Sequence, residues 1–167
     1  MEPKRAIVLV GHGAAPADYP RERLRRLKSL EAERTARGRG EMSDEEAALD
    51  REIRAWPRTP ASDPYKSGLE ELARALARRS GREVAAAYNE FCGPSLEDAV
   101  SALAAGGAAR IEVATTMFTR GGIHSECEIP HAVGRLRERF PSVEIVYAWP
   151  YDADLAADFL ARHLEGR

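Results

Sequence analysis

Short apolar segments recur along the chain, and longer segments with helical spacing separate most of them. Four runs rich in β-branched or apolar residues have the length of a strand: residues 5–10, 83–88, 110–115 and 143–148. Strands that alternate with helices indicate right-handed crossovers and a parallel sheet with helices on both faces. The pattern therefore predicts a doubly wound α/β fold with a four-stranded parallel sheet.

Start and stop signals place the helices that connect and follow these strands. The predicted helices begin near Ser67, Ser95, Pro130 and Asp154. Glu70 follows Ser67 at the spacing of a capping box, and Gly106 can end the second helix because glycine readily adopts the left-handed conformation. The last helix carries an apolar stripe, which consists of Leu155, Phe159, Leu160 and Leu164.

Residues 17–64 interrupt the alternation of strands and helices. The segment is too long and too patterned for a bare loop. Leu24, Leu27 and Leu30 indicate one helix, and Ser43 begins a second that ends at Pro57. We interpret residues 17–64 as a helical insertion above the carboxyl edge of the sheet, either a lid or a dimer contact, within a single domain that spans residues 1–167.

The composition is that of a water-soluble globular domain. The chain has 167 residues, of which 44% are hydrophobic and 31% charged, so one hydrophobic core is expected. No apolar run approaches the roughly 20 residues of a membrane helix, and the first residues do not resemble a signal peptide. We therefore expect a cytoplasmic protein without membrane contact, in which the two cysteines, Cys92 and Cys127, are free thiols.

The net charge of −2 argues against a protein that binds nucleic acid. The charged residues are nevertheless unevenly distributed along the chain. Eight basic residues gather between positions 21 and 39, and acidic residues dominate positions 41–52. The basic residues are Arg21, Arg23, Arg25, Arg26, Lys28, Arg34, Arg37 and Arg39. Two explanations fit this run: a solvated helix face, which is the usual one, or a surface that grips a polyanionic ligand.

Three successive strands end in residues that bind metals or transfer protons. His12 follows the first strand between Gly11 and Gly13, Glu90 follows the second strand, and His124 follows the third. Each residue also has a purely structural explanation, since a histidine can satisfy a carbonyl and a carboxylate can stabilise a helix N-terminus. The carboxyl ends of parallel strands meet at one sheet edge, so we expect the three side chains to converge there. Imidazole and carboxylate together predict an open site for a divalent first-row metal.

The motifs that carry these residues resemble those of the CbiX/SirB group of class II chelatases, the sirohydrochlorin cobaltochelatase/ferrochelatase family. The resemblance rests on the segment Ile7-Val8-Leu9-Val10-Gly11-His12-Gly13, on residues 88–95 around Glu90, and on residues 117–130, which contain His124 and the triplet Glu128-Ile129-Pro130. It covers residues 4–10 and the chain from about residue 65 onward. The three motifs stand in the family's order.

The resemblance implies insertion of Co²⁺, Fe²⁺ or Ni²⁺ into sirohydrochlorin or a related tetrapyrrole, without ATP and without an organic cofactor, by a small homodimer. His12 and His124 would hold the metal and accept protons, Glu90 would complete the site or relay protons, and Glu128 would orient a histidine. For the carboxylate-bearing macrocycle, the predicted binding residues are Gly11, Gly13, Tyr88, Met117, Phe118, Arg120 and Gly122. Arg120 and the basic run would bind its carboxylates.

Two departures from the family pattern leave alternatives open. Ala14-Ala15 stands where the family has Ser-Arg after His-Gly, and the insertion has no counterpart in minimal members. The alternative is a metal-binding or tetrapyrrole-binding protein on the chelatase scaffold without turnover. A hydrolase or transferase that uses His12 or His124 as a base has less support, because the chain contains no nucleophile elbow and no phosphate-binding glycine loop.

Overall fold

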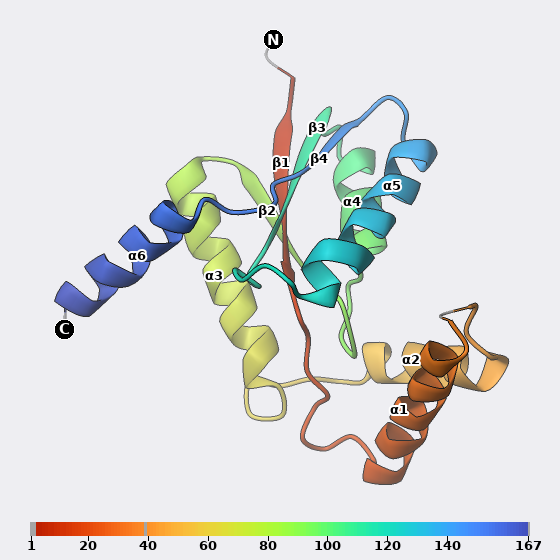
Figure 1. Ribbon diagram of the computed structural model, residues 1–167. Coiled ribbons are helices and arrows are strands. Elements are labelled where there is room, and N and C mark those ends of the chain that lie inside the picture. The colour runs from red at the N-terminus through yellow and green to blue at the C-terminus, as the bar shows by residue number, and fades with distance from the viewer. Residues whose placement is uncertain (1–2, 39, 167) are drawn as a thin grey trace.

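The computed structural model describes residues 3–38 and 40–166, and within them it contains one four-stranded sheet (Figure 1). The strands are β1 (Arg5–Gly11), β2 (Glu83–Tyr88), β3 (Arg110–Thr115) and β4 (Glu144–Tyr147). All pairs are parallel, and the order is β2-β1-β3-β4. The predicted α/β fold is therefore confirmed. Four residues lie outside the described part of the chain: Met1, Glu2, Arg39 and Arg167. The two ends of the predicted domain and Arg39, the last residue of the basic run, are therefore not described.

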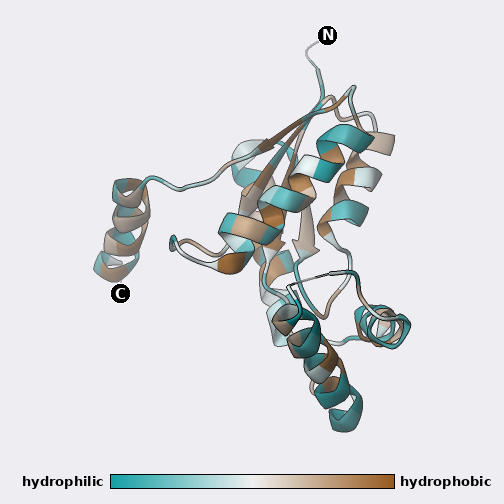
Figure 2. Ribbon diagram, turned by 45° about the vertical axis from the view of Figure 1, so that its right-hand side comes forward, coloured by the Kyte–Doolittle hydropathy of each residue, from teal (hydrophilic) through white to brown (hydrophobic). Residues whose placement is uncertain are grey.

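Helices cover the two faces of the sheet unequally (Figures 1 and 2). Helices α4 (Leu96–Ala105) and α5 (Ile129–Arg139) pack on one face, where their apolar side chains meet those of β1 and β3 in the largest buried cluster. Helix α3 (Pro64–Ser80) packs on the other face through Leu69 and Ala73, which contact Leu9 and Tyr88. The alternation of side chains along β1 thus supplies both layers.

Capping residues fix the ends of the helices at the carboxyl edge. Helix α4 begins after Ser95, as predicted, and the structure adds a full capping box: the Ser95 hydroxyl accepts from the Asp98 N–H while the Asp98 carboxylate accepts from the Ser95 N–H. The predicted start of α3 at Ser67 is wrong. That helix begins one turn earlier at Pro64, because the carboxylate of Asp63 accepts from the Lys66 N–H and proline fits the first helical position.

The insertion forms helices α1 (Arg21–Ala36) and α2 (Asp44–Ala55), beyond the carboxyl ends of the strands (Figure 1). The two helices share a small apolar cluster that includes Leu27 and Ile53. Much of the basic run is paired within the insertion: Arg23 with Glu52, Arg26 with Glu45, Arg34 with Glu46, and Arg37 with Glu33. Three of these four pairs join α1 to α2, so charges that the sequence separates into two runs neutralise each other between adjacent helices.

Helix α6 (Ala153–Glu165) extends away from the sheet (Figures 1 and 2). The predicted helix is present, but its stripe of Leu155, Phe159, Leu160 and Leu164 is exposed and none of its described side chains is buried. The sheet and α3 to α5 therefore form their core without it. Within the described residues, no helix combines the length and the apolar character needed to cross a membrane.

Candidate metal centre

His12, Glu90 and His124 converge at the carboxyl edge of the sheet and form the group called here the His–Glu–His triad. Each residue offers one ligand atom, and the three atoms lie within 4.8 Å of one another. The two imidazole rings meet edge to face, with their centroids 4.8 Å apart. The side chains are 45%, 20% and 18% exposed, in that order. The strand order explains the convergence, because β1 lies between β2 and β3.

Close approach of two backbones positions His12. The His12 N–H donates to the hydroxyl of Tyr65, 2.7 Å away, and the His12 carbonyl accepts from the Glu90 N–H at 2.8 Å. A Cβ atom on Gly13 would lie 1.9 Å from the Glu90 carbonyl oxygen, and Gly13 has a φ of 95°. Glycine is required here for both reasons. The Gly13 carbonyl accepts a hydrogen bond from Nδ1 of His12 over a distance of 2.9 Å.

A π-helical turn over His124–Glu128 positions His124 and leads directly into α5. The prediction placed His124 in a loop before Pro130; the structure places it on this turn, because proline fits the first turn of α5 and does not interrupt the helical path. Nδ1 of His124 lies 2.6 Å from a Glu128 carboxylate oxygen. The Asn89 amide also donates to Glu128, at 2.8 Å.

These contacts orient both rings. The Gly13 carbonyl can only accept, so Nδ1 of the neutral His12 ring carries the proton and its Nε2 keeps a free lone pair. Nδ1 of His124 is held by two groups, the Glu128 carboxylate and the Asn89 amide nitrogen 2.8 Å away, and this leaves its Nε2 without a contact to either of them. Both Nε2 atoms face Glu90, at 3.8 Å and 3.5 Å from its two carboxylate oxygens. Two imidazole nitrogens and a carboxylate suit a divalent first-row metal and leave coordination positions open.

Two arginines of the insertion hold the loop that carries Glu90. From α2, Arg54 donates to the carbonyls of Cys92 and Asn89, each at 2.9 Å. Arg58, just after α2, donates to the carbonyls of Ala14 and Phe91 and pairs with Asp63. Neither arginine stands out in the sequence, because the charge pattern alone does not distinguish an arginine that binds the carbonyls of a distant loop from an arginine that is exposed to solvent.

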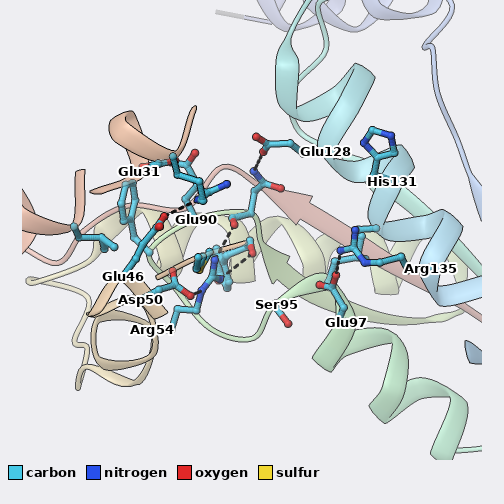
Figure 3. A pocket seen from close by; sticks show the side chains of 18 residues that line it. Glu31, Glu46, Asp50, Arg54, Glu90, Ser95, Glu97, Glu128, His131 and Arg135 are labelled. Atoms are coloured by element: carbon cyan, nitrogen blue, oxygen red, sulfur yellow. Dashed lines mark hydrogen bonds and ion pairs between the residues drawn. The ribbon is translucent and has the colours of Figure 1, made fainter. Parts of the chain in front are cut away.

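A cavity of about 440 Å³ opens beside the triad, between the insertion and helices α4 and α5 (Figure 3). Glu90 and Glu128 border it, together with ion pairs such as Arg54 with Asp50 and Arg135 with Glu97. Glu31 of α1 also faces this space; its pKa is raised by burial and by the nearby Glu90 carboxylate. Anionic groups therefore outnumber cationic ones where the cavity meets the triad, which favours a metal cation.

The residues predicted to bind the macrocycle are more scattered than the triad. Phe118 is 52% exposed and its ring lies 5.3 Å from that of Tyr151, whereas Met117 packs partly against the main core. Arg120 is exposed and lies 3.7 Å from Glu126. Tyr88 is fully buried and belongs to the core cluster with Leu69 and Ala73, and the residue also borders the 440 Å³ cavity. Gly11 and Gly122 sit in tight backbone environments, against Leu69 and Ser125 respectively.

Neither cysteine belongs to the triad. Both are free thiols, as expected: Cys92 is buried, and burial raises the pKa of its thiol, while Cys127 is exposed. His131 of α5 also lines the 440 Å³ cavity. The neutral, buried state of Cys92 suits packing and not metal binding, since thiolate is the ligand form.

Comparison with known proteins identifies the family of this arrangement. The CbiX family model matches residues 61–163, well over half of the chain. No curated protein sequence matches the chain. A CbiX protein from Marinobacter aquaeolei VT8 shares the fold with a TM-score of 0.54 and 18% identity, over 98% of this chain and 99% of that one.

Two further structures are longer proteins. The sirohydrochlorin chelatase SirB from Bacillus subtilis subspecies spizizenii, in complex with cobalt, matches with a TM-score of 0.45 and 18% identity over 88% of this chain and 43% of its own. SirB from Bacillus subtilis with Fe³⁺ matches with a TM-score of 0.44 and 20% identity, over 86% and 39%. This chain thus spans less than half of either SirB chain.

Proposed function

The chain belongs to the CbiX family, and on that premise we propose that it inserts a divalent metal ion, Co²⁺, Ni²⁺ or Fe²⁺, into sirohydrochlorin or a related tetrapyrrole. The reaction needs no organic cofactor and no ATP. The metal ion is a substrate, and it must be held loosely enough to be released. SirB structures have been solved with cobalt and with Fe³⁺, which supports a first-row metal as the substrate ion.

One observation carries the proposal: protein groups hold the Nδ1 atoms of His12 and His124, and the Nε2 atoms of both rings lie near the Glu90 carboxylate, at 3.8 Å and 3.5 Å. Such an arrangement offers three ligand atoms on one side and leaves the opposite side free for a macrocycle. Oriented imidazoles bind more effectively than free ones, because the orientation is fixed before the ion arrives. Nitrogen and carboxylate ligands also exchange more readily than thiolates.

The same residues can manage the protons. Insertion of M²⁺ into a neutral macrocycle releases two pyrrole protons, and a base must accept each of them. The Nε2 atoms of His12 and His124 each accept one of these protons as the metal leaves them for the macrocycle. Glu128 then stabilises the imidazolium form of His124, because its carboxylate lies 2.6 Å from Nδ1. Glu90, between the rings, relays protons toward solvent.

Substrate binding is assigned to the surroundings of the triad. Phe118 and Met117 supply apolar contacts for the ring, and Arg120 and unpaired members of the basic run bind carboxylates. We also propose that the protein acts as a homodimer in the cytoplasm, as the family resemblance implies; sedimentation velocity tests the oligomeric state.

The experiment that tests the function follows the absorbance of sirohydrochlorin with Co²⁺, Ni²⁺ or Fe²⁺, with and without protein, against the spontaneous rate. The matched variant is His12→Ala/His124→Ala, and Cys127→Ser serves as a control outside the triad. Acceleration that disappears only in the histidine variant supports the chelatase and ranks the metals. Binding of metal or macrocycle without acceleration for any metal instead supports the alternative, a binding protein without turnover.

A further inference from the structure

Helix α1 of the insertion presents one side to the space in front of the His–Glu–His triad. A second cavity, of about 620 Å³, has His12, Glu90 and Phe91 on one wall and α1 on the other. The α1 residues that line it are Lys28, Glu31, Ala32, Thr35 and Ala36. Their spacing of three and four residues places them on a single face of the helix.

The other sides of α1 are already used for packing. Leu27 is buried against Ile53, and Leu24 packs beside them. Arg23 and Arg26 pair with glutamates of α2. Because these contacts fix the helix, the orientation of its cavity face is fixed as well.

The cavity face of α1 combines small side chains with one cation, Lys28, and one carboxylate, Glu31. Ala32, Thr35 and Ala36 are exposed and leave the helix surface nearly flat. The Lys28 ammonium lies 5.6 Å from the centroid of the Phe91 ring and makes no ion pair among residues 3–38 and 40–166. Of the residues that the structure describes, Lys28 is the one lysine or arginine that lines this cavity. A flat apolar surface with a cation at its edge suits a planar macrocycle that carries carboxylates.

We propose that α1 forms the second wall of the macrocycle site: Ala32 and Ala36 pack against one face of the ring, and Lys28 binds one of its carboxylates. The triad then faces the ring from the opposite wall, so that a metal held by His12 and Glu90 reaches the ring centre. This inference rests on the proposed function. It assigns substrate contacts to a part of the chain that lies before the segment matched by the CbiX family model.

The test measures metal-free sirohydrochlorin binding by absorbance titration, and Co²⁺ binding without macrocycle by calorimetry. Ala32→Leu fills the cavity face while keeping good helix propensity, and Ala48→Leu, on an exposed position of α2, is its matched control. Lys28→Gln removes the cation and Lys28→Arg retains it. Arg37 projects from the side of α1 opposite to Lys28 and does not line the cavity, so Arg37→Gln controls for the loss of one positive charge.

We expect Ala32→Leu to weaken macrocycle binding at least tenfold, and Lys28→Gln about fivefold with less dependence on salt, while Co²⁺ affinity stays unchanged in both. Lys28→Arg and the two controls should bind like the wild type. If the wild type binds sirohydrochlorin and Ala32→Leu binds it equally well, this inference is overturned and the proposed function stands. A change in sedimentation with unchanged binding would make the α1 face a subunit contact instead. A wild type that binds no tetrapyrrole overturns both proposals.

Discussion

Replacement of Arg58 by methionine should destabilise the protein strongly, because it breaks a buried ion pair that joins three segments. Arg58 and Asp63 are 5% and 1% exposed. Arg58 also donates to the carbonyls of Ala14, Ile53 and Phe91. Without the guanidinium, Asp63 keeps a charge that water cannot reach.

The expected magnitude follows from the cost of breaking one side of such a pair, about 3–5 kcal/mol. In a chain of this size, that loss lowers Tm by about 10 °C. Asp63→Asn in the same variant removes the stranded charge and retains the N-cap of α3, so the double variant should recover about half of the loss. The free energy of unfolding is measured by urea titration of tryptophan fluorescence, which Trp56 reports from the insertion.

Arg135→Met is the control, since its pair with Glu97 is on the surface and should contribute less than about 1 kcal/mol. If Arg58→Met costs no more than this control, or if the double variant is less stable than the single one, the assignment of Arg58 as the link between insertion and core is refuted.

Three further predictions concern the site and the sheet. Gly13→Ala should displace the Glu90 loop, costing about 1–3 kcal/mol in unfolding free energy and most of the Co²⁺ affinity, both readable by urea titration and calorimetry; unchanged affinity would contradict the close contact. Glu128→Gln should weaken Co²⁺ binding about 10- to 100-fold, with unchanged thermal stability, because His124 loses the carboxylate that orients it. The pKa of Glu112 is lowered to about 2 by the hydrogen bond from Arg82 and by two other arginines. The ionised Glu112 side chain therefore stabilises the fold fully above its unfolded pKa, and this stabilisation is lost as pH falls toward 2. Between pH 6 and pH 2, the free energy of unfolding of the wild type should fall by about 1 kcal/mol more than that of Glu112→Gln, measured by urea titration at each pH. An equal fall in both proteins would refute this prediction.

Residue pattern predicted the sheet well because its signals are local. The second and third strands have the predicted bounds, the first extends one residue further, and the last is shorter, since pairing with β3 involves only four residues of β4. The start of α4 after Ser95 was predicted equally well. Asp63 was overlooked in favour of Ser67, because both residues can cap a helix and only tertiary contacts with Arg58 select the first.

The convergence of the triad could be predicted, but not the residues that support it. His12, Glu90 and His124 each follow a strand, and parallel topology brings strand ends together whatever the details of packing. The supporting contacts of Arg54 and Arg58 depend on where the insertion folds back, and the contact of Asn89 with Glu128 depends on how two strand ends pack; no local pattern encodes either. For the same reason, the burial of Tyr88 was not foreseen, since its neighbours are on α3.

The three ligand residues follow different strands, and this has a thermodynamic consequence. An unfolded or half-folded chain cannot assemble them, so an ion that binds the triad binds the native state almost exclusively. By linkage, an ion at one hundred times its dissociation constant adds about 2.7 kcal/mol to the free energy of unfolding. Under the proposed function, metal supply therefore raises the free energy of unfolding, and a chelator should lower the stability of the metal-loaded protein.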